Sequence, residues 1–239
     1  MIDLHCHLLP NIDDGPKSLE EALTLAELAA KNGIIRAIAT PHIHPGRYEN
    51  DRINIQDAYA RFSRELKERG IPLLLGFSAE VRMGPEIIPM IERNEIPFLG
   101  SIDGYKVMLL EFPHSHIPIG SEKLVNWLLA RKIRPMIAHP ERNKEIVRNP
   151  EKASVLIRKG CMLQVTAGSV SGLFGSPVQK AAAYLLKNDW IFAMASDAHN
   201  FHHRPPEMES GRRVAEKILG EEASWNLVRQ NPMSIIFNG

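Results

Sequence analysis

The chain has 239 residues, of which 44% are hydrophobic and 24% charged, and its formal net charge is +1 at pH 7. These values are typical of a globular protein of one large or two small domains, and they argue against a nucleic-acid or anionic-membrane surface. Two cysteines, Cys6 and Cys161, do not make a disulfide scaffold, and no apolar stretch approaches the ~18 residues of a membrane span. No targeting segment precedes the first apolar run, so we expect a cytoplasmic protein.

Short apolar runs alternate with helical patterns along the chain. Seven runs predict strands at 2–7, 35–42, 71–81, 105–112, 133–140, 161–168 and 190–199. Between them, apolar residues recur every three or four positions, which predicts helices at 18–33, 53–70, 84–94, 121–132, 150–160 and 177–188. Ser18 and Glu21 form a capping-box pattern at the start of the first helix, and the segment after Pro205 predicts two more helices.

The strand patterns indicate the fold class. The runs are almost continuously apolar, as in a parallel sheet that is buried on both faces. Seven strand–helix units follow one another without a Pro-, Gly- or Ser-rich linker, which predicts an α/β fold with one closed or nearly closed barrel over residues 1–239. A doubly wound open sheet is the alternative, because periodicity alone does not close a barrel.

Histidines and carboxylates lie at the C-terminal ends of these runs, where a barrel of parallel strands keeps its active site. In chain order they are His5, His7, His42, Glu80, Glu111, His139, Asp197 and His199. All ten histidines fall at strand ends or in the loops that follow, and none falls in a predicted helix. Residues two apart on a strand share a face, so His5 and His7 should point into the mouth of the barrel while Cys6 points to the helices.

This donor set predicts a metal centre. Imidazoles and carboxylates without thiolates suit divalent ions such as manganese, iron or zinc. With Asp13 and Asp14 on the first loop there are at least nine donors, enough for two or three ions that share bridging carboxylates. The spacing does not decide between Asp13 and Asp14.

The same motifs resemble a known superfamily. The HCH at 5–7, the TPH that ends at His42, the SAEVR around Glu80, the LLEF around Glu111, the HPER from His139 and the SDAH at 196–199 resemble the polymerase-and-histidinol-phosphatase (PHP) superfamily. The strings DDGPKS at 13–18 and AHPER at 138–142 resemble, more narrowly, the bacterial PHP-type protein tyrosine phosphatases of capsular and exopolysaccharide synthesis (CpsB/CapC-like).

The resemblance implies a distorted (β/α)7 barrel with three metal ions, manganese being the first choice and iron, zinc or magnesium the others. It assigns the first ion to His5, His7, Glu80 and Asp197, the second to Glu80, Glu111 and His139, and the third to Asp14, His42 and His199. It also implies two phosphate-binding arginines, Arg142 and Arg204.

The implied reaction is attack of metal-bound hydroxide on phosphorus, with both arginines neutralising charge on the phosphate oxygens. The implied substrate is phosphotyrosine on a protein, expected to be a bacterial tyrosine kinase that controls capsule or exopolysaccharide synthesis. Short strand-end loops predict an open mouth, and Phe201 is the rim residue predicted to contact the phenyl ring. Neither nucleic-acid binding nor membrane insertion is expected.

The same residues bear on several other classes of protein. A cysteine-dependent phosphatase needs an arginine six positions after its cysteine, but Ile12 and Ala167 stand there. The usual binuclear amidohydrolase has a bridging lysine where this chain has Glu111. Histidinol-phosphate phosphatase, or another small-molecule phosphoesterase of the superfamily, remains the closest rival, and a structural metal module is the non-enzyme alternative. The native metal, the exact substrate, the oligomeric state and a general acid (His44, His114, His116, His202 or His203) stay open.

Overall fold

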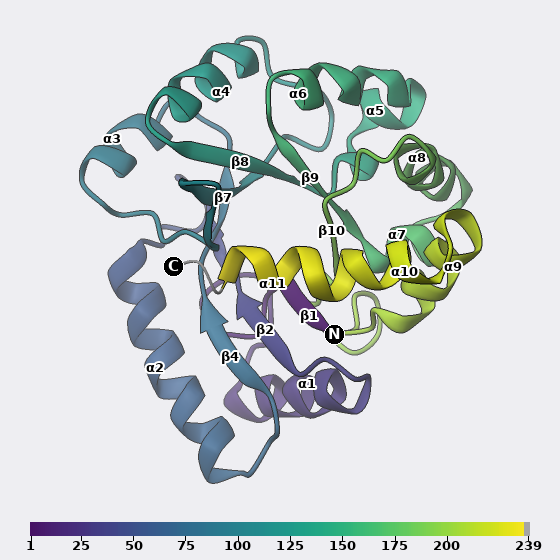
Figure 1. The fold of residues 1–239 in the computed structure, drawn as a ribbon. Helices are drawn as coiled ribbons and strands as arrows, with labels where there is room; N and C mark the ends of the chain where they lie inside the picture. The colour runs from purple at the N-terminus through teal and green to yellow at the C-terminus, as the bar shows by residue number, and fades with distance from the viewer. Residues whose placement is uncertain (237–239) are drawn as a thin grey trace.

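The computed structural model describes residues 1–236 as parallel strands surrounded by helices (Figure 1). The strands are β1 (Ile2–Cys6), β2 (Arg36–Ala39), β3 (His42–Ile43), β4 (Leu74–Phe77), β5 (Glu80–Arg82), β6 (Gly100–Ile102), β7 (Tyr105–Glu111), β8 (Ile133–Ala138), β9 (Met162–Thr166) and β10 (Ala193–Ala195). The helices are α1 (Leu19–Lys31), α2 (Arg52–Glu68), α3 (Ile87–Glu92), α4 (Ser121–Ala130), α5 (Lys144–Arg148), α6 (Ser154–Arg158), α7 (Ala167–Ser171), α8 (Ser176–Lys187), α9 (Glu209–Leu219), α10 (Glu221–Trp225) and α11 (Asn231–Ile236). Short turns of helix lie at η1 (Pro140–Arg142), η2 (Pro150–Ala153) and η3 (Asn226–Gln230).

Each of the seven predicted apolar runs contains a strand, but two of them break. The run 35–42 becomes β2 and β3 on either side of Thr40 and Pro41, since proline has no N–H to give to a neighbouring strand. The run 71–81 also divides, into β4 and β5 on either side of Ser78 and Ala79. There β3 pairs with β5, and His42 lies opposite Glu80. The antiparallel strand β6 was not predicted.

The strands pair in two sheets. One has the order β1-β2-β4, and the other has the order β10-β9-β8-β7-β5-β3, with β6 added beside β7. All pairs except β6–β7 are parallel, which confirms the predicted α/β class with parallel sheets. The amide of Asp197 donates to the carbonyl of His5, and the amide of His7 to that of Ala198, both at 2.8 Å. Closure into a barrel stays a prediction.

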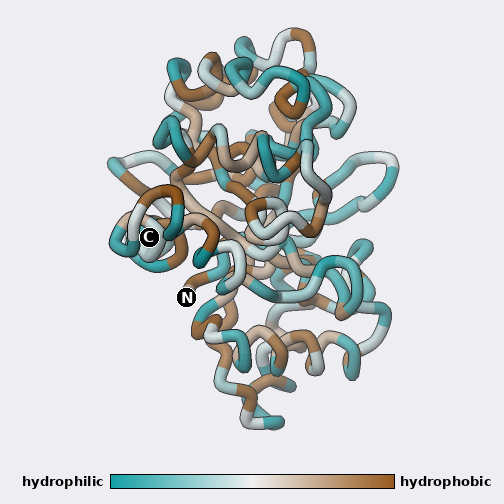
Figure 2. The backbone as a smooth tube through the Cα atoms, turned by 90° about the vertical axis from the view of Figure 1, so that its right-hand side faces the viewer, coloured by the Kyte–Doolittle hydropathy of each residue, from teal (hydrophilic) through white to brown (hydrophobic). Residues whose placement is uncertain are grey.

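The strands bury apolar side chains on both faces. One face packs against the helices, and Cys6 lies on it, fully buried, with its Sγ 3.4 Å from the carbonyl of Ile38. The other face forms a second core between the strands, with Leu4, Leu109 and Met136 among its members and Ile235 of α11 packed against them. In Figure 1, α11 crosses in front of the strands, and in Figure 2 the outer turns are largely teal, that is, hydrophilic. The space between the strands is therefore filled by packed side chains.

The helix ends follow local rules. Ser18 caps α1 by accepting from the amide of Glu21, as predicted, whereas the Glu21 carboxylate accepts from the amide of Lys17. The segment after Pro205 contains more helical pieces than the two predicted: α9, α10, η3 and α11. Among residues 1–236, no helix combines the length and the apolar character needed to cross a membrane.

Candidate metal centre

The predicted ligands gather at one end of the strands. His5 and Glu80 lie within β1 and β5, His42 begins β3, and His139 and Asp197 come just after β8 and β10. His139 and Asp197 have φ values of 33° and 52°, in a left-handed region that residues other than glycine seldom adopt. Such backbone conformations cluster at functional sites, because the surrounding structure must hold them in place.

The first group of donors is wholly buried. It consists of His5, His7, Glu80 and Asp197, whose donor atoms all lie within 4.8 Å of one another. The His5 Nε2 lies 3.2 Å from Glu80 Oε2, 3.3 Å from Asp197 Oδ1 and 3.3 Å from His7 Nε2. Four donors that face one point in this way match the ligand set that the family resemblance assigned to the first ion.

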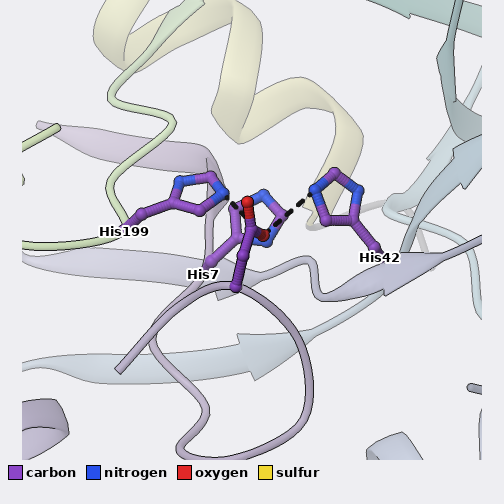
Figure 3. A group of neighbouring side chains, drawn as sticks. His7, His42 and His199 are labelled. Carbon is purple, nitrogen blue, oxygen red and sulfur yellow. Dashed lines mark ion pairs between the residues drawn. The ribbon is translucent and has the colours of Figure 1, made fainter. Parts of the chain in front are cut away.

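The second group joins three imidazoles to one carboxylate. The Asp14 Oδ1 lies 3.4 Å from His42 Nε2 and 3.3 Å from His199 Nε2. In Figure 3, His199 and His42 approach from opposite sides, and His7 lies between them. His7 also belongs to this group by distance, so it lies between the first and second groups of donors.

The third group is built on Glu80. The His42 Nδ1 lies 3.1 Å from Glu80 Oε2, and Glu111 completes the group. The resemblance placed His139 with Glu80 and Glu111, and its Nε2 does lie 2.8 Å from Glu80 Oε1. Glu80 belongs to both this group and the first, so its carboxylate would serve both if each group held an ion.

Unpartnered atoms test whether these residues fit a metal cluster. Asp14 Oδ1, His42 Nδ1, Glu80 Oε2 and His199 Nε2 are buried. Each lies 3.1–3.4 Å from a neighbouring donor atom of the cluster, but none has the geometry of a hydrogen bond to a described residue. A buried polar atom without a partner is costly, and native proteins rarely keep several of them side by side. Divalent ions would satisfy all four, and nitrogen and oxygen donors without sulfur suit such ions. The residues therefore fit the cluster that the sequence predicted.

Neighbouring side chains fix the orientation of the imidazoles. The Asp13 Oδ2 lies 2.6 Å from His7 Nδ1, and the Gln164 Oε1 lies 2.8 Å from His5 Nδ1. A carboxylate or amide oxygen on the far nitrogen directs the other nitrogen of the ring to a metal. The structure thus separates the two aspartates: Asp14 faces the cluster, while Asp13 orients His7. Gln164 was not predicted, because it stands within an apolar run far from His5 in sequence.

The charges around the cluster set the protonation of its members. Burial and the nearby charge of Arg142 lower the pKa of His139 to about 4. Burial and the nearby charge of His7 lower the pKa of His199 to about 4. Both imidazoles are therefore neutral at pH 7, which is the form that binds metal. Burial would raise the pKa of Asp197, but the guanidinium of Arg142 holds it well below its usual range.

Both predicted arginines reach the cluster. Arg142 donates from Nη1 to Asp197 Oδ2, and the Arg204 Nη2 donates to Asp14 Oδ2 at 3.1 Å. Both line a pocket of about 120 Å³ over the carboxylates, together with His44, Arg47 and Arg82, which were not predicted to bind phosphate. Arg82 could have been found, because it stands two residues after Glu80 and so shares its strand face.

Of the other predicted residues at the rim, His44 lines this pocket and the rest lie outside it. Phe201 does not line it; its ring is half-buried against the helix-side core and faces His202 edge-on, with 6.3 Å between the ring centroids. Among the candidate general acids, His44 lines the pocket and His114 lines an adjoining one. Burial lowers the pKa of both imidazoles. The positive charge of Arg82 lowers the pKa of His44 further, and that of Arg142 lowers the pKa of His114 further. Both shifts favour the neutral form of the imidazole.

Comparison with known proteins gives a consistent result. A family model described as capsular polysaccharide synthesis, CpsB/CapC, matches residues 1–237. The tyrosine-protein phosphatase YwqE of Bacillus subtilis is 35% identical over 227 residues, 95% of this chain and 88% of YwqE. CpsB of Streptococcus pneumoniae, also a tyrosine-protein phosphatase, is 30% identical over 244 residues, 100% of this chain and 99% of CpsB.

Solved structures show the same relationship. One from the work on YwqE from Bacillus subtilis and CpsB from Streptococcus pneumoniae, described as unique metal-dependent tyrosine phosphatases, superimposes with a TM-score of 0.92 and 34% sequence identity. The match covers 100% of this chain and 95% of that one. An organophosphorus hydrolase from Deinococcus radiodurans, at 16% identity and a TM-score of 0.55, shares the fold alone, covering 99% of this chain and 92% of its own.

Proposed function

The chain belongs to the CpsB/CapC family of capsular polysaccharide synthesis, and from that premise we propose that its metal centre hydrolyses phosphotyrosine on a partner protein. It is an enzyme, a metal-dependent tyrosine phosphatase like its relatives. The observation that carries the proposal is the convergence of buried, unpartnered donor atoms beside two arginines.

We assign the ligands by combining the geometry with the family resemblance. His5, His7, Glu80 and Asp197 would hold one ion; Glu80, Glu111 and His139, with His42 beside them, a second; Asp14, His42 and His199 a third. Manganese is the first choice among the divalent ions. The proposal includes closure of the strands into a distorted barrel of seven βα units over residues 1–239, which the hydrogen bonds between His5, His7 and the chain after β10 support.

The chemistry divides between the ions and the side chains. When bound, the ions supply a hydroxide nucleophile at neutral pH and neutralise charge on the phosphate oxygens. Arg142 and Arg204 present planar guanidinium groups that match phosphate oxygens in pairs. Asp197 and Asp14 hold these two arginines over the centre. A phenolate leaves with little protonation, so the site does not depend on His44 or His114 as an acid.

The proposed partner is a bacterial tyrosine kinase of capsule or exopolysaccharide synthesis, met in the cytoplasm. The family description and the phosphatase names of the relatives support a substrate of this kind. A protein substrate needs an accessible site, and Arg204 and Asp14 at the mouth keep exposed side-chain fractions of 25% and 31%.

A side-by-side comparison of substrates tests the proposal. The metal-loaded protein should give its highest kcat/KM with a phosphotyrosine peptide, ahead of histidinol phosphate, a phosphoserine peptide and small sugar phosphates. The rivals share the metal chemistry, so only the contacts around the phosphate can separate them. A preference of ~10²-fold for any of the last three substrates would overturn the tyrosine assignment and leave the metal centre standing.

A further inference from the structure

A small hollow adjoins the metal centre on the side of α7 and α8. The chain leaves α7 at Gly172, passes through Leu173 and Phe174, and turns again at Gly175; both glycines have positive φ, 98° and 87°. The hollow has a volume of about 130 Å³, and its walls include Leu173, Phe174 and Pro205. It was not predicted from the sequence, which offers no local signal at this turn.

The hollow borders the proposed phosphate site. Arg204 lines both the hollow and the pocket over the metal ligands, and Ser196, which precedes Asp197, lines the hollow as well. The Phe174 ring lies under the guanidinium of Arg142, with 5.0 Å between the Arg142 Cζ and the ring centroid. The apolar wall formed by Leu173, Phe174 and Pro205 therefore lies directly beside Arg142 and Arg204.

The wall is held in place and is open to solvent. Leu173 is 53% exposed, and Phe174 is partly exposed. Both pack over Gly168, where an added Cβ would lie 3.1 Å from Leu173 Cδ2 and 3.2 Å from Phe174 Cε2. The amide of Leu173 donates to the carbonyl of Gly168 at 2.8 Å, and the Gln179 side chain donates to the carbonyl of Val170 at 3.1 Å. These contacts fix the turn before any ligand binds.

We propose that this hollow takes the phenyl ring of phosphotyrosine, with Phe174 as the side chain that contacts the ring and Arg142 and Arg204 on the phosphate. The inference rests on the proposed function and deepens it. A cavity of roughly 150 Å³ holds benzene, so a hollow of this size has room for one aromatic ring. The ring would lie against the apolar part of the wall, because Ser171, Ser196 and Glu207 line the polar part. Aromatic pairs pack offset or edge to face, and a partly exposed Phe174 offers a free face for this.

Two other places for the ring fit less well. A hollow of about 190 Å³ adjoins the cluster at Glu111 and His139, but its aromatic residue, Phe112, is only 5% exposed and packs into the core. Phe201, the ring contact predicted from the sequence, lines neither the hollow nor the metal pocket. Phe174 replaces Phe201 in the proposal.

The test separates ring binding from phosphate binding in the metal-loaded protein. Phe174→Ala should raise KM for a phosphotyrosine peptide and Ki for phenylphosphonate by about 5- to 30-fold, through loss of a ring contact and of the apolar area that it covers. Ki for inorganic phosphate should stay within about two-fold, because phosphate meets only the ions and the arginines. Phe174→Tyr should restore both constants, and Phe174→Leu, which keeps the packing on Gly168, should still raise them. Leu74→Ala, at a leucine that is 61% exposed at the far end of the strands, is the matched surface control.

Three results would overturn the inference. One is an unchanged Ki for phenylphosphonate in a folded Phe174→Leu variant. Another is an equal rise in the Ki for inorganic phosphate in Phe174→Ala, since Phe174 would then act only through Arg142. A third is a rise in the Ki for phenylphosphonate in Phe201→Ala but not in Phe174→Ala. Failure of the proposed function would show separately, as a wild-type preference for phosphoserine or histidinol phosphate.

Discussion

His5→Ala is expected to lower kcat/KM for a phosphotyrosine peptide by at least ~10²-fold, because the loss of a residue that merely orients a metal ligand already costs ~10–100-fold. The His5 Nε2 faces Glu80 and Asp197 at 3.2 and 3.3 Å in a fully buried site, and alanine offers no donor atom there. His42→Ala should have an effect of similar size. The measurement is steady-state kinetics with the metal content of each variant determined in parallel.

Cys6→Ser is the matched control for His5→Ala, because it changes the next residue on the same strand. Its side chain lies in the core against the helices, and burial raises the pKa of the Cys6 thiol well above its usual value, so no thiolate forms at neutral pH. Turnover should stay within about three-fold of wild type. A Cys6→Ser variant as damaged as His5→Ala, with its metal retained, would contradict a metal-based mechanism.

Arg142→Ala is expected to lower kcat/KM for a phosphotyrosine peptide by ~10–10³-fold, the range for losing one charged contact to the transition state. Arg142 is bound to Asp197 and reaches into the pocket over the cluster. Arg142→Lys should recover only part of the loss, since lysine cannot bind two oxygens in one plane.

Arg134→Ala supplies the control, because Arg134 also pairs with an aspartate, Asp103, at 3.2 Å. Arg134 lies near the N-terminal end of β8, whereas Arg142 follows its C-terminal end. The kcat/KM of Arg134→Ala should match wild type. Metal analysis of Arg142→Ala shows whether Asp197 still holds its ion once its partner is gone. If Arg142→Ala and Arg134→Ala gave the same rate at full metal content, Arg142 would have no part in phosphate binding.

Much of the site could be predicted because its rules are local. His5 and His7 stand two apart on a strand, so their common face follows from the pleat alone. The position of the other ligands at the C-terminal ends of apolar runs followed from the strand–helix alternation. The spacing does not show whether Asp13 or Asp14 is the metal ligand, and only the family resemblance points to Asp14. The structure is consistent with that choice, because the Asp13 carboxylate contacts His7.

The parts that could not be predicted depend on contacts between distant segments. Gln164 orients His5 from 159 residues away, and no pattern within its apolar run marks it as polar support. The break of two strands and the position of α11 across the strands depend on how the sheets pair and pack. The aromatic side chain beside the phosphate site presented the same difficulty: Phe201 follows the SDAH motif closely, whereas Phe174 reaches Arg142 only through the turn after α7.

The central claim is that phosphotyrosine hydrolysis requires a cluster of ions on the predicted ligands. Titrating metal-free protein with Mn²⁺, while counting ions bound per chain and measuring phosphotyrosine hydrolysis in the same samples, tests it most directly. We expect activity to appear only as about two or three ions bind, the number that the donors can hold, and His5→Ala to bind fewer. Full activity in metal-free protein, or at less than one bound ion per chain, would contradict the account.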